Sequence, residues 1–391
     1  MSNETPWQSP AGPSSALPPS PYATSDRAAP PPAGAPGWTP PPKPGLIPLR
    51  PLTLGTLLGA AFQVLRRNPR PMFGFSLALT GLIFLVTLVV VGLVSFFAFS
   101  RVTSATGEDA AAIAAGATAT IILSALVPVM LSIVVTAFLQ AVVVLEVARG
   151  TVGEKLKLRG LWNAAKGRIG AIIGWALLLT GAAVTALAIL SVVIGLIIAF
   201  GGTAGIVIGV ILGVLAAGGS AVVWFWLGTR LCLVPSALML ERLPLRAAIT
   251  RSWSLTTGYF WKTLGIQLLV SVIVQTVASI IAAPLQGVLL LGSSLINPNG
   301  DETGLAVGVV VLYILTVIVT IVFGAIAAVI QAATTALIYI DIRMRKEGLD
   351  LELSRFVEAR QAGDTSVMDP YQPRATGTPE PQAPAQASPW S

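Results

Sequence analysis

The sequence of 391 residues contains no histidine and only one cysteine, Cys232. Without histidine the chain lacks the commonest general base and a frequent metal ligand. A single cysteine excludes an intrachain disulfide and a cysteine-rich metal cluster. No nucleophile motif or phosphate-binding loop stands out among the other residues. We therefore expect no catalytic residue, no metal site and no cofactor, and we do not expect an enzyme.

Charged residues are also scarce, at 10% of the chain, whereas 54% of the residues are hydrophobic. In soluble domains about a quarter of the residues are charged, so this composition indicates a membrane protein. The chain has 24 Lys and Arg against 17 Asp and Glu. These basic residues lie between apolar runs, where an anionic membrane surface suits them better than nucleic acid. The expected partners are the lipid bilayer and anionic lipid headgroups, with no nucleic acid.

Six apolar runs are long enough to cross a bilayer, for which about 20 residues suffice. They form three pairs, at residues 72–99 and 113–145, 169–200 and 206–240, and 260–291 and 305–340. The second run of each pair is longer than one crossing needs and must tilt, kink or protrude. Pro128 and Pro235 are candidate kinks. The predicted fold class is an all-α integral membrane protein with six transmembrane helices.

Each pair of runs follows a short amphipathic segment, which is clearest in the stretch LPLRAAITRSWSLTTGYFWKTLG. At about 100° per residue, Leu245, Ile249 and Trp253 fall on one apolar arc of a helix. Arg246 and Arg251 lie on the two flanks of that arc. This pattern is typical of a helix that lies in the membrane surface, with its basic side chains reaching lipid phosphates.

Segments 54–68 and 156–169 repeat this amphipathic pattern before the other two pairs of runs. In the first of them, Thr53 is a suitable N-cap and Pro69 should end the helix. The chain is therefore interpreted as three pseudo-repeats, each an interfacial amphipathic helix followed by a transmembrane hairpin.

Basic side chains on or beside these segments are the candidates for binding anionic lipid headgroups. They are Arg66, Arg67, Arg159, Lys166, Arg246, Arg251 and Lys262. Nearly all basic residues that flank the six runs lie on the side of these segments, and Arg101 is the exception. By the positive-inside rule we expect a multi-pass protein of the cell membrane with both termini in the cytoplasm.

The second run of every pair ends in an acidic residue that an arginine follows. The three pairs are Glu146 with Arg149, Glu241 with Arg242, and Asp341 with Arg343. The recurrence supports a threefold repeat. The pairs are either lipid or ion sites, or helix-end ion pairs that face water.

Arg230 is the one candidate for a charge within the depth of the membrane. Counted back from the terminal acids, Gln331, Gln140 and Thr136 have similar positions in the other return runs. The four side chains are therefore candidates for a polar centre of the bundle, because a deep charge needs a partner. In the alternative interpretation, nearby tryptophans mark the membrane interface and Arg230 reaches headgroups.

Proline-rich segments flank the apolar part of the chain, and about half of the 29 prolines precede residue 49. We expect residues 1–48 to be a disordered cytoplasmic tail and residues 49–354 to form the membrane domain. Residues 355–391 should begin as a charged helical extension and become disordered beyond about Gly363. An unidentified protein partner could bind these tails.

Three stretches resemble a known bacterial family: LTLGTLLGAAFQVLRRNP, LERLPLRAAITRSWSLTTGYFWKTLG and YIDIRMRKEGLDLEL. They are similar to the membrane domain of glycerophosphoryl diester phosphodiesterase, and the resemblance covers about residues 50–354. In that family the membrane part can precede a catalytic barrel, and the resemblance implies no activity for the membrane part alone. The enzyme chemistry of the family uses a pair of histidines and a carboxylate-bound metal, and this chain has no histidine.

These observations favour a non-catalytic membrane module that binds anionic lipid at its cytoplasmic face and acts as a scaffold for envelope-lipid processes. The alternative is a small transporter or lipid translocator that uses the polar centre around Arg230.

Overall fold

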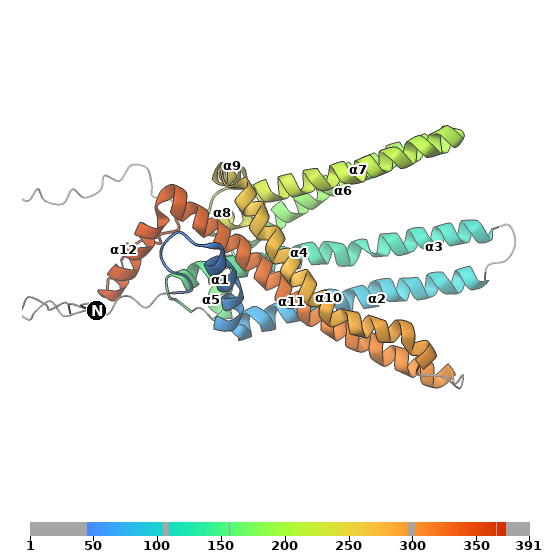
Figure 1. Ribbon diagram of the computed structural model, residues 1–391, viewed down its shortest axis with the longest axis horizontal. Coiled ribbons are helices and arrows are strands. Elements are labelled where there is room, and N and C mark those ends of the chain that lie inside the picture. The colour runs from blue at the N-terminus through green and yellow to red at the C-terminus, as the bar shows by residue number, and fades with distance from the viewer. Residues whose placement is uncertain (1–44, 105–108, 156, 296–301, 365, 373–391) are drawn as a thin grey trace, which may run out of the picture. The chain divides into compact units, whose positions relative to one another are not determined.

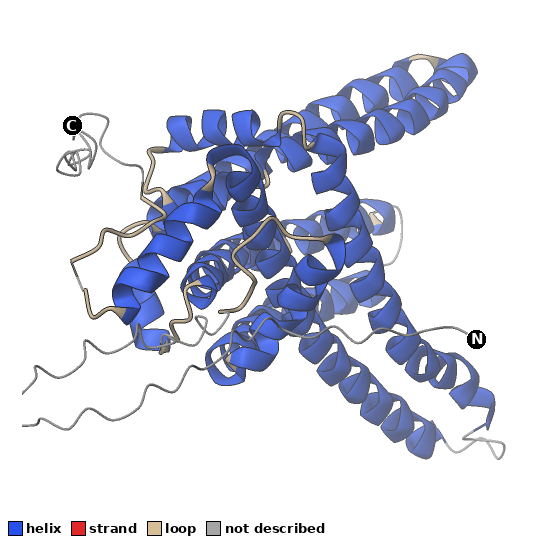
Figure 2. Ribbon diagram, turned by 60° about the vertical axis from the view of Figure 1, so that its left-hand side comes forward, coloured by secondary structure: helices blue, strands red, loops and turns tan. Residues whose placement is uncertain are grey.

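The computed structural model describes residues 45–104, 109–155, 157–295, 302–364 and 366–372, and these residues form helices and loops without a strand (Figure 2). The expected all-α fold class is thereby confirmed. Most of both proline-rich tails, for which we expected disorder, lies outside the described residues. The helices are α1 (Leu54–Arg67), α2 (Phe75–Ser104), α3 (Ala110–Ser124), α4 (Leu126–Thr151), α5 (Leu158–Ala165), α6 (Ile169–Phe200), α7 (Gly202–Leu231), α8 (Val234–Leu240), α9 (Leu245–Thr256), α10 (Phe260–Leu295), α11 (Glu302–Glu347) and α12 (Leu349–Gln361).

Six segments of the described chain are long and apolar enough to span a membrane, as the sequence predicts. Three hairpins contain them: α2 with α3 and α4, α6 with α7 and α8, and α10 with α11. The hairpins extend from a common end of the bundle and diverge (Figure 1). In the most apolar stretch of each span, no more than 17% of the residues are buried within the chain. This exposed apolar surface suits a bilayer, where the solvent is itself apolar.

Local signals explain several helix ends. Thr53 caps α1, and its hydroxyl oxygen accepts a hydrogen bond from the Thr56 amide at 3.3 Å. The helix ends at Arg67, two residues before Pro69, as predicted. Pro128 and Pro235 lie in the first turns of α4 and α8, directly after the breaks that separate these helices from α3 and α7. Proline fits there because the first turn has no use for its missing N–H.

The buried core lies at the end of the bundle where α4, α8 and α11 meet the short helices. There α1 packs on α11, α5 packs on α4, and α9 packs on α8. Each amphipathic helix thus packs on the second half of the hairpin that precedes it, and α1 closes the circle on the last hairpin. This order of contacts fits the interpretation as three pseudo-repeats, which stays a prediction.

The amphipathic helices differ from the expectation that their whole apolar arc faces lipid. On α1, Leu57, Ala61 and Val64 are buried, whereas Leu54 and Phe62 on the same arc are 48% and 40% exposed. The arc is therefore shared between the protein core and the surroundings. A helical wheel cannot separate these two environments, because both are apolar.

Residues 366–372 differ from the disorder expected beyond about Gly363. Tyr371 is only 2% exposed, and its hydroxyl bonds to the Thr151 hydroxyl and donates to the Ala148 carbonyl. The Asp369 carboxylate lies 2.6 Å from the Arg149 guanidinium. Burial raises the pKa of Tyr371 above its usual range. A buried aromatic ring and a short ion pair thus hold this segment on the end of α4.

Replacing Tyr371 with alanine should release residues 366–372 from α4. Truncation of a buried aromatic residue typically lowers stability by about 3–5 kcal/mol. We expect about 3 kcal/mol for the attachment of this segment, because a short segment has few other contacts to lose. Hydrogen exchange of the amides in this segment should accelerate strongly, while α4 and α11 keep their protection. Met368→Ala is the matched control, since Met368 is 75% exposed. Unchanged exchange in the Tyr371 variant would show that the ring does not hold the segment.

Candidate functional site

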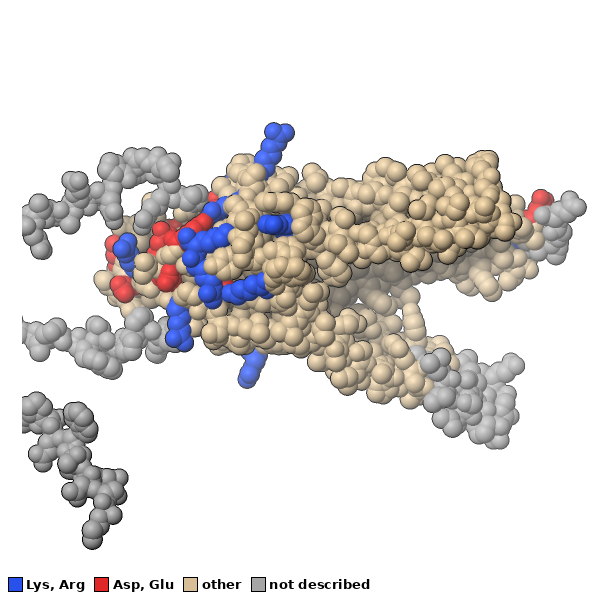
Figure 3. Space-filling view, turned by 45° about the horizontal axis from the view of Figure 1, so that its top comes forward, with Lys and Arg blue, Asp and Glu red and all other residues tan. Residues whose placement is uncertain are grey.

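The polar residues gather at the end of the bundle that holds the core. We call this end the polar platform, and it consists of α1, α5, α8, α9, α12 and the last turns of α4 and α11. Lys and Arg side chains concentrate where the platform meets the hairpins, and acidic side chains on the visible face lie mostly farther from the hairpins (Figure 3). Such a band of cations on one face is the distribution expected beside anionic headgroups.

Asp341 of α11 is a buried link between three parts of the platform. Its side chain is 2% exposed and lies 2.6 Å from the Lys262 ammonium and 3.0 Å from the Arg345 guanidinium. It also accepts the Leu52 amide at 2.8 Å, just before α1 begins. This carboxylate therefore joins the start of α1 to α10 and α11.

Glu241, directly after α8, forms the second buried link. Its two carboxylate oxygens share the single N–H of Arg251 Nε, at 2.9 and 3.0 Å. The Tyr339 hydroxyl donates to the same carboxylate, and the Arg343 guanidinium lies 3.7 Å away. Arg251 and Arg343 both also bond to Glu347. The cluster ties α8, α9 and α11 together.

Glu146 of α4 is the third terminal acid, and it is 2% exposed. One of its oxygens accepts the Asn68 side-chain amide at 3.1 Å. Its Oε2 atom is buried and has no hydrogen-bond partner among the residues that the structure describes. Glu146 therefore links Asn68 to α4 through a neutral amide, whereas Asp341 and Glu241 form ion pairs with cations.

The three acids correct the interpretation of the acid and arginine pairs as helix-end ion pairs that face water. They do not face water, and Glu146 and Arg149 have separate partners, Asn68 and Asp369. Arg343 does lie 3.7 Å from a terminal acid, but that acid is Glu241 of the preceding repeat. The acids are buried links between helices, and removing one partner from such a link leaves an uncompensated charge.

Three of the seven lipid-headgroup candidates are engaged in contacts of this kind. Arg67 donates to the carbonyls of Gly150 at 2.6 Å and Glu154 at 3.3 Å. Lys262 pairs with Asp341, and Arg251 pairs with Glu241 and Glu347. Burial disfavours the Arg251 cation, but the two carboxylates outweigh this and raise the pKa of Arg251. These three residues hold the platform together.

The other four candidates are exposed cations. Within the described ranges they form no hydrogen bond or ion pair, so their charges are available to a ligand. They are Arg66, Arg159, Lys166 and Arg246. Each amphipathic helix also exposes one aromatic side chain: Phe62 is 40% exposed, Trp162 is 47% exposed and Trp253 is 38% exposed.

Arg230 lies at the end of α7 against α9 and α10. Its guanidinium carbon is 5.1 Å from the centre of the Trp253 ring and 5.5 Å from that of Phe260. Its NH1 group donates to the Thr257 hydroxyl at 3.1 Å. These contacts with aromatic residues fit the alternative in which Arg230 lies at the membrane interface, which stays a prediction.

The other polar-centre candidates lie apart from Arg230. Gln331 is exposed and its amide lies 3.5 Å from the Ser271 hydroxyl. Thr136 is exposed and Gln140 is half-buried. Among the contacts of the described residues, none joins Arg230 to any of these three.

Sequence reasoning missed several residues of the platform, including Asn68, Tyr339, Thr257 and Tyr371. Tyr371 carried a usable signal, because it is one of few large apolar residues after Gly363. Tyr339 stands two residues before Asp341, where it looked like part of an apolar run. Its role depends on Glu241, which is 98 residues away in the sequence.

Comparison with known families confirms the resemblance inferred from the motifs. Residues 203–362 match the family described as the membrane domain of glycerophosphoryl diester phosphodiesterase. The matched region runs from the start of α7 through α12 and corresponds to the membrane part of that family. Searches of the curated proteins and of the solved structures found no match.

Proposed function

We propose that the chain is a non-catalytic membrane module that binds anionic lipid through its polar platform and acts as a scaffold for envelope-lipid processes. In this proposal the platform lies on the cytoplasmic side of the cell membrane, where anionic lipids attract basic residues.

The observation that carries the proposal is an exposed aromatic residue and an exposed cation on the same side of each amphipathic segment. The pairs are Phe62 with Arg66 on α1, Trp162 on α5 with Lys166 directly after that helix, and Trp253 with Arg246 on α9. Spacings of four or seven residues place the two side chains within about 40° of each other around a helix. The ring can lie at headgroup depth while the cation meets a phosphate.

The buried acids support the same function by fixing the helices that carry these pairs. Asp341 holds the start of α1, and Glu241 holds Arg251 on α9. Rigid placement lowers the ordering cost when a ligand binds. A translocator would need polar side chains that converge within the bundle, and the separate positions of Arg230, Gln331 and Thr136 favour the module.

Neutralising the exposed cations should weaken the preference for anionic lipid. In vesicles of mixed composition, spin-labelled phosphatidylglycerol should be enriched over spin-labelled phosphatidylcholine in the lipid shell of the protein. We expect the combined changes Arg66→Gln, Lys166→Gln and Arg246→Gln to reduce this enrichment by about 1 kcal/mol per charge at low salt. Electron paramagnetic resonance measures the fraction of each lipid in contact with the protein.

Arg355→Gln is the control, because it removes an exposed charge from α12, which carries none of the three pairs and lies at the end of the platform away from the hairpins (Figure 1). The control should leave the preference unchanged. An equal preference in the triple variant and the unmodified chain, with both folded, would contradict the proposal.

A further inference from the structure

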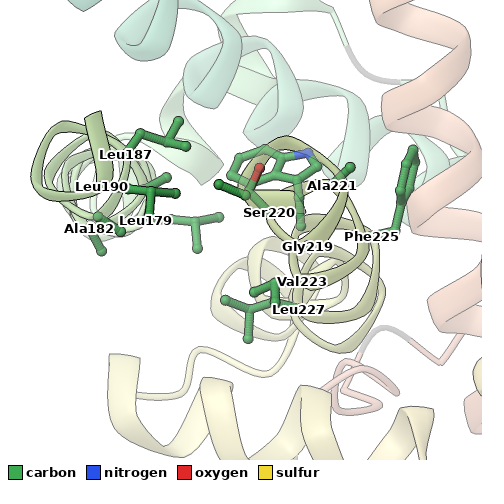
Figure 4. A pocket seen from close by; sticks show the side chains of 14 residues that line it. Leu179, Ala182, Leu187, Leu190, Gly219, Ser220, Ala221, Val223, Phe225 and Leu227 are labelled. Carbon is green, nitrogen blue, oxygen red and sulfur yellow. The ribbon is translucent and has the colours of Figure 1, made fainter. Parts of the chain in front are cut away.

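An apolar groove of about 710 Å³ lies between α6 and α7, within the part of the chain expected to span the bilayer. Leu179, Ala183 and Leu187 of α6 line one wall, and Gly219, Val223 and Leu227 of α7 line the other. The leucines of α6 point across the gap toward Ser220 and Gly219 of α7 (Figure 4). The volume is in the range of about 300–1,000 Å³ that ligand pockets in proteins have.

Small residues create the groove. Ala182, Ala183 and Ala186 on α6 oppose Ala216 and Gly219 on α7. A Cβ atom built on Gly219 would meet no atom within 4 Å. The small residues of the two helices thus lie along the same stretch, and the groove between them has room for a chain of methylene groups.

Arg230 stands at the platform end of this groove. It follows Leu227 by three residues, so it lies about 60° around α7 from that lining residue and about 4.5 Å further along the axis. The faces of Trp253 and Phe260 pack near its guanidinium. Its Nε atom is buried and has no hydrogen-bond partner among the described residues.

No carboxylate in the described chain pairs with Arg230, unlike Arg251 or Arg343 in the platform. A buried N–H group without an acceptor costs about 1–3 kcal/mol, so a small shift of the side chain that brings this N–H to an acceptor would be stabilising. Arginine binds phosphate through two parallel N–H bonds, and stacking on aromatic rings leaves these N–H edges available.

We propose that the groove holds one acyl chain of an anionic phospholipid whose phosphate lies against Arg230. The inference rests on the proposed lipid-binding function and adds one defined site to it. A helix of a second copy is a poorer occupant, because the apolar runs carry no acidic residue that could meet Arg230 at this depth.

Photocrosslinking tests the site directly. The intact chain is reconstituted in phosphatidylcholine nanodiscs with a trace of phosphatidylglycerol that carries a diazirine in its acyl chain. Peptides from residues 179–190 and 216–227 should be labelled above the other spans. The same diazirine on phosphatidylcholine should label them several times less, because its choline cation offsets the phosphate charge, and a loss of about 1 kcal/mol corresponds to about a fivefold change in affinity.

Two variants separate the chain-binding and phosphate-binding parts of the site. Gly219→Leu should fill the groove and abolish the labelling, whereas Gly218→Leu should not, since Gly218 does not line the groove and also has no atom near its added side chain. Arg230→Gln should reduce the phosphatidylglycerol labelling about fivefold and change the phosphatidylcholine labelling much less, because the choline cation already offsets the charge of that phosphate. The melting temperature of each variant serves as the check on folding.

Equal labelling by the two lipids, or labelling that Gly219→Leu leaves intact, would overturn the proposal. Crosslinks between two copies of the chain through α6 and α7 would also overturn it. Arg246→Gln should lower the general preference for anionic lipid without changing the groove labelling. Failure of the surface proposal and failure of this site are therefore distinguishable.

Discussion

Asp341→Asn should lower the free energy of unfolding by about 2–3 kcal/mol. Loss of one partner from a buried ion pair typically costs about 3–5 kcal/mol, and we reduce this because the Lys262 and Arg345 side chains are 35% and 30% exposed. The asparagine could still accept the Leu52 amide, but its NH₂ group would face the Lys262 ammonium. The asparagine NH₂ group and the Lys262 ammonium are both hydrogen-bond donors, so the hydrogen bond between these two positions would be lost.

The stability of the Asp341 variant can be measured by thermal or denaturant unfolding in a mild detergent. Glu358→Gln is the control, because Glu358 is an exposed carboxylate on α12. It removes the same charge and should change stability by less than about 0.5 kcal/mol. Equal stabilities of the two variants would mean that Asp341 is not a structural link.

Glu241→Gln should destabilise the platform by a similar amount, about 2–4 kcal/mol. The Arg343 side chain is only 7% exposed, so water can compensate little for the lost carboxylate. Glu347 remains as a partner of Arg251 and Arg343, which keeps the loss below the full cost of a broken buried pair. The change should also loosen α9, because Arg251 attaches that helix to Glu241.

Tyr339→Phe provides a graded comparison at the same cluster. It removes only the hydroxyl that donates to Glu241 and keeps the two charged partners of that acid. The expected loss is about 1 kcal/mol, the usual net value of one hydrogen bond. Hydrogen exchange of the α9 amides should accelerate in the Glu241 variant and change little in the Tyr339 variant. The reverse order would show that the charge does not hold α9.

The contrast between Arg251 and Arg246 shows the limit of wheel-based reasoning. Both residues flank the apolar arc of the same amphipathic segment, and both were therefore lipid candidates. In the folded chain Arg251 meets Glu241 and Glu347, whereas Arg246 is exposed. The wheel gives the direction of a side chain from its own helix axis, but the partner comes from other helices.

The six membrane spans and several helix ends could be predicted from the amino-acid sequence alone. The six spans follow from long apolar runs, because in a bilayer such segments are stable as helices regardless of their neighbours. The start of α1 at Thr53 and the breaks before Pro128 and Pro235 follow from backbone hydrogen bonding within a few residues. The resemblance to the family was likewise readable from three short stretches.

The positions of the charged residues depended on tertiary packing. Asp341 contacts Leu52 across 289 positions of the sequence, and Tyr371 contacts Thr151 across 220. Burial of the three terminal acids results from the convergence of α4, α8 and α11 with the amphipathic helices. Local patterns carry no information about such distant partners, because the energy of a buried charge depends on what surrounds it in space. The amino-acid order therefore indicated where the chain meets the membrane, while the packing decided which of its cations remain available to lipid.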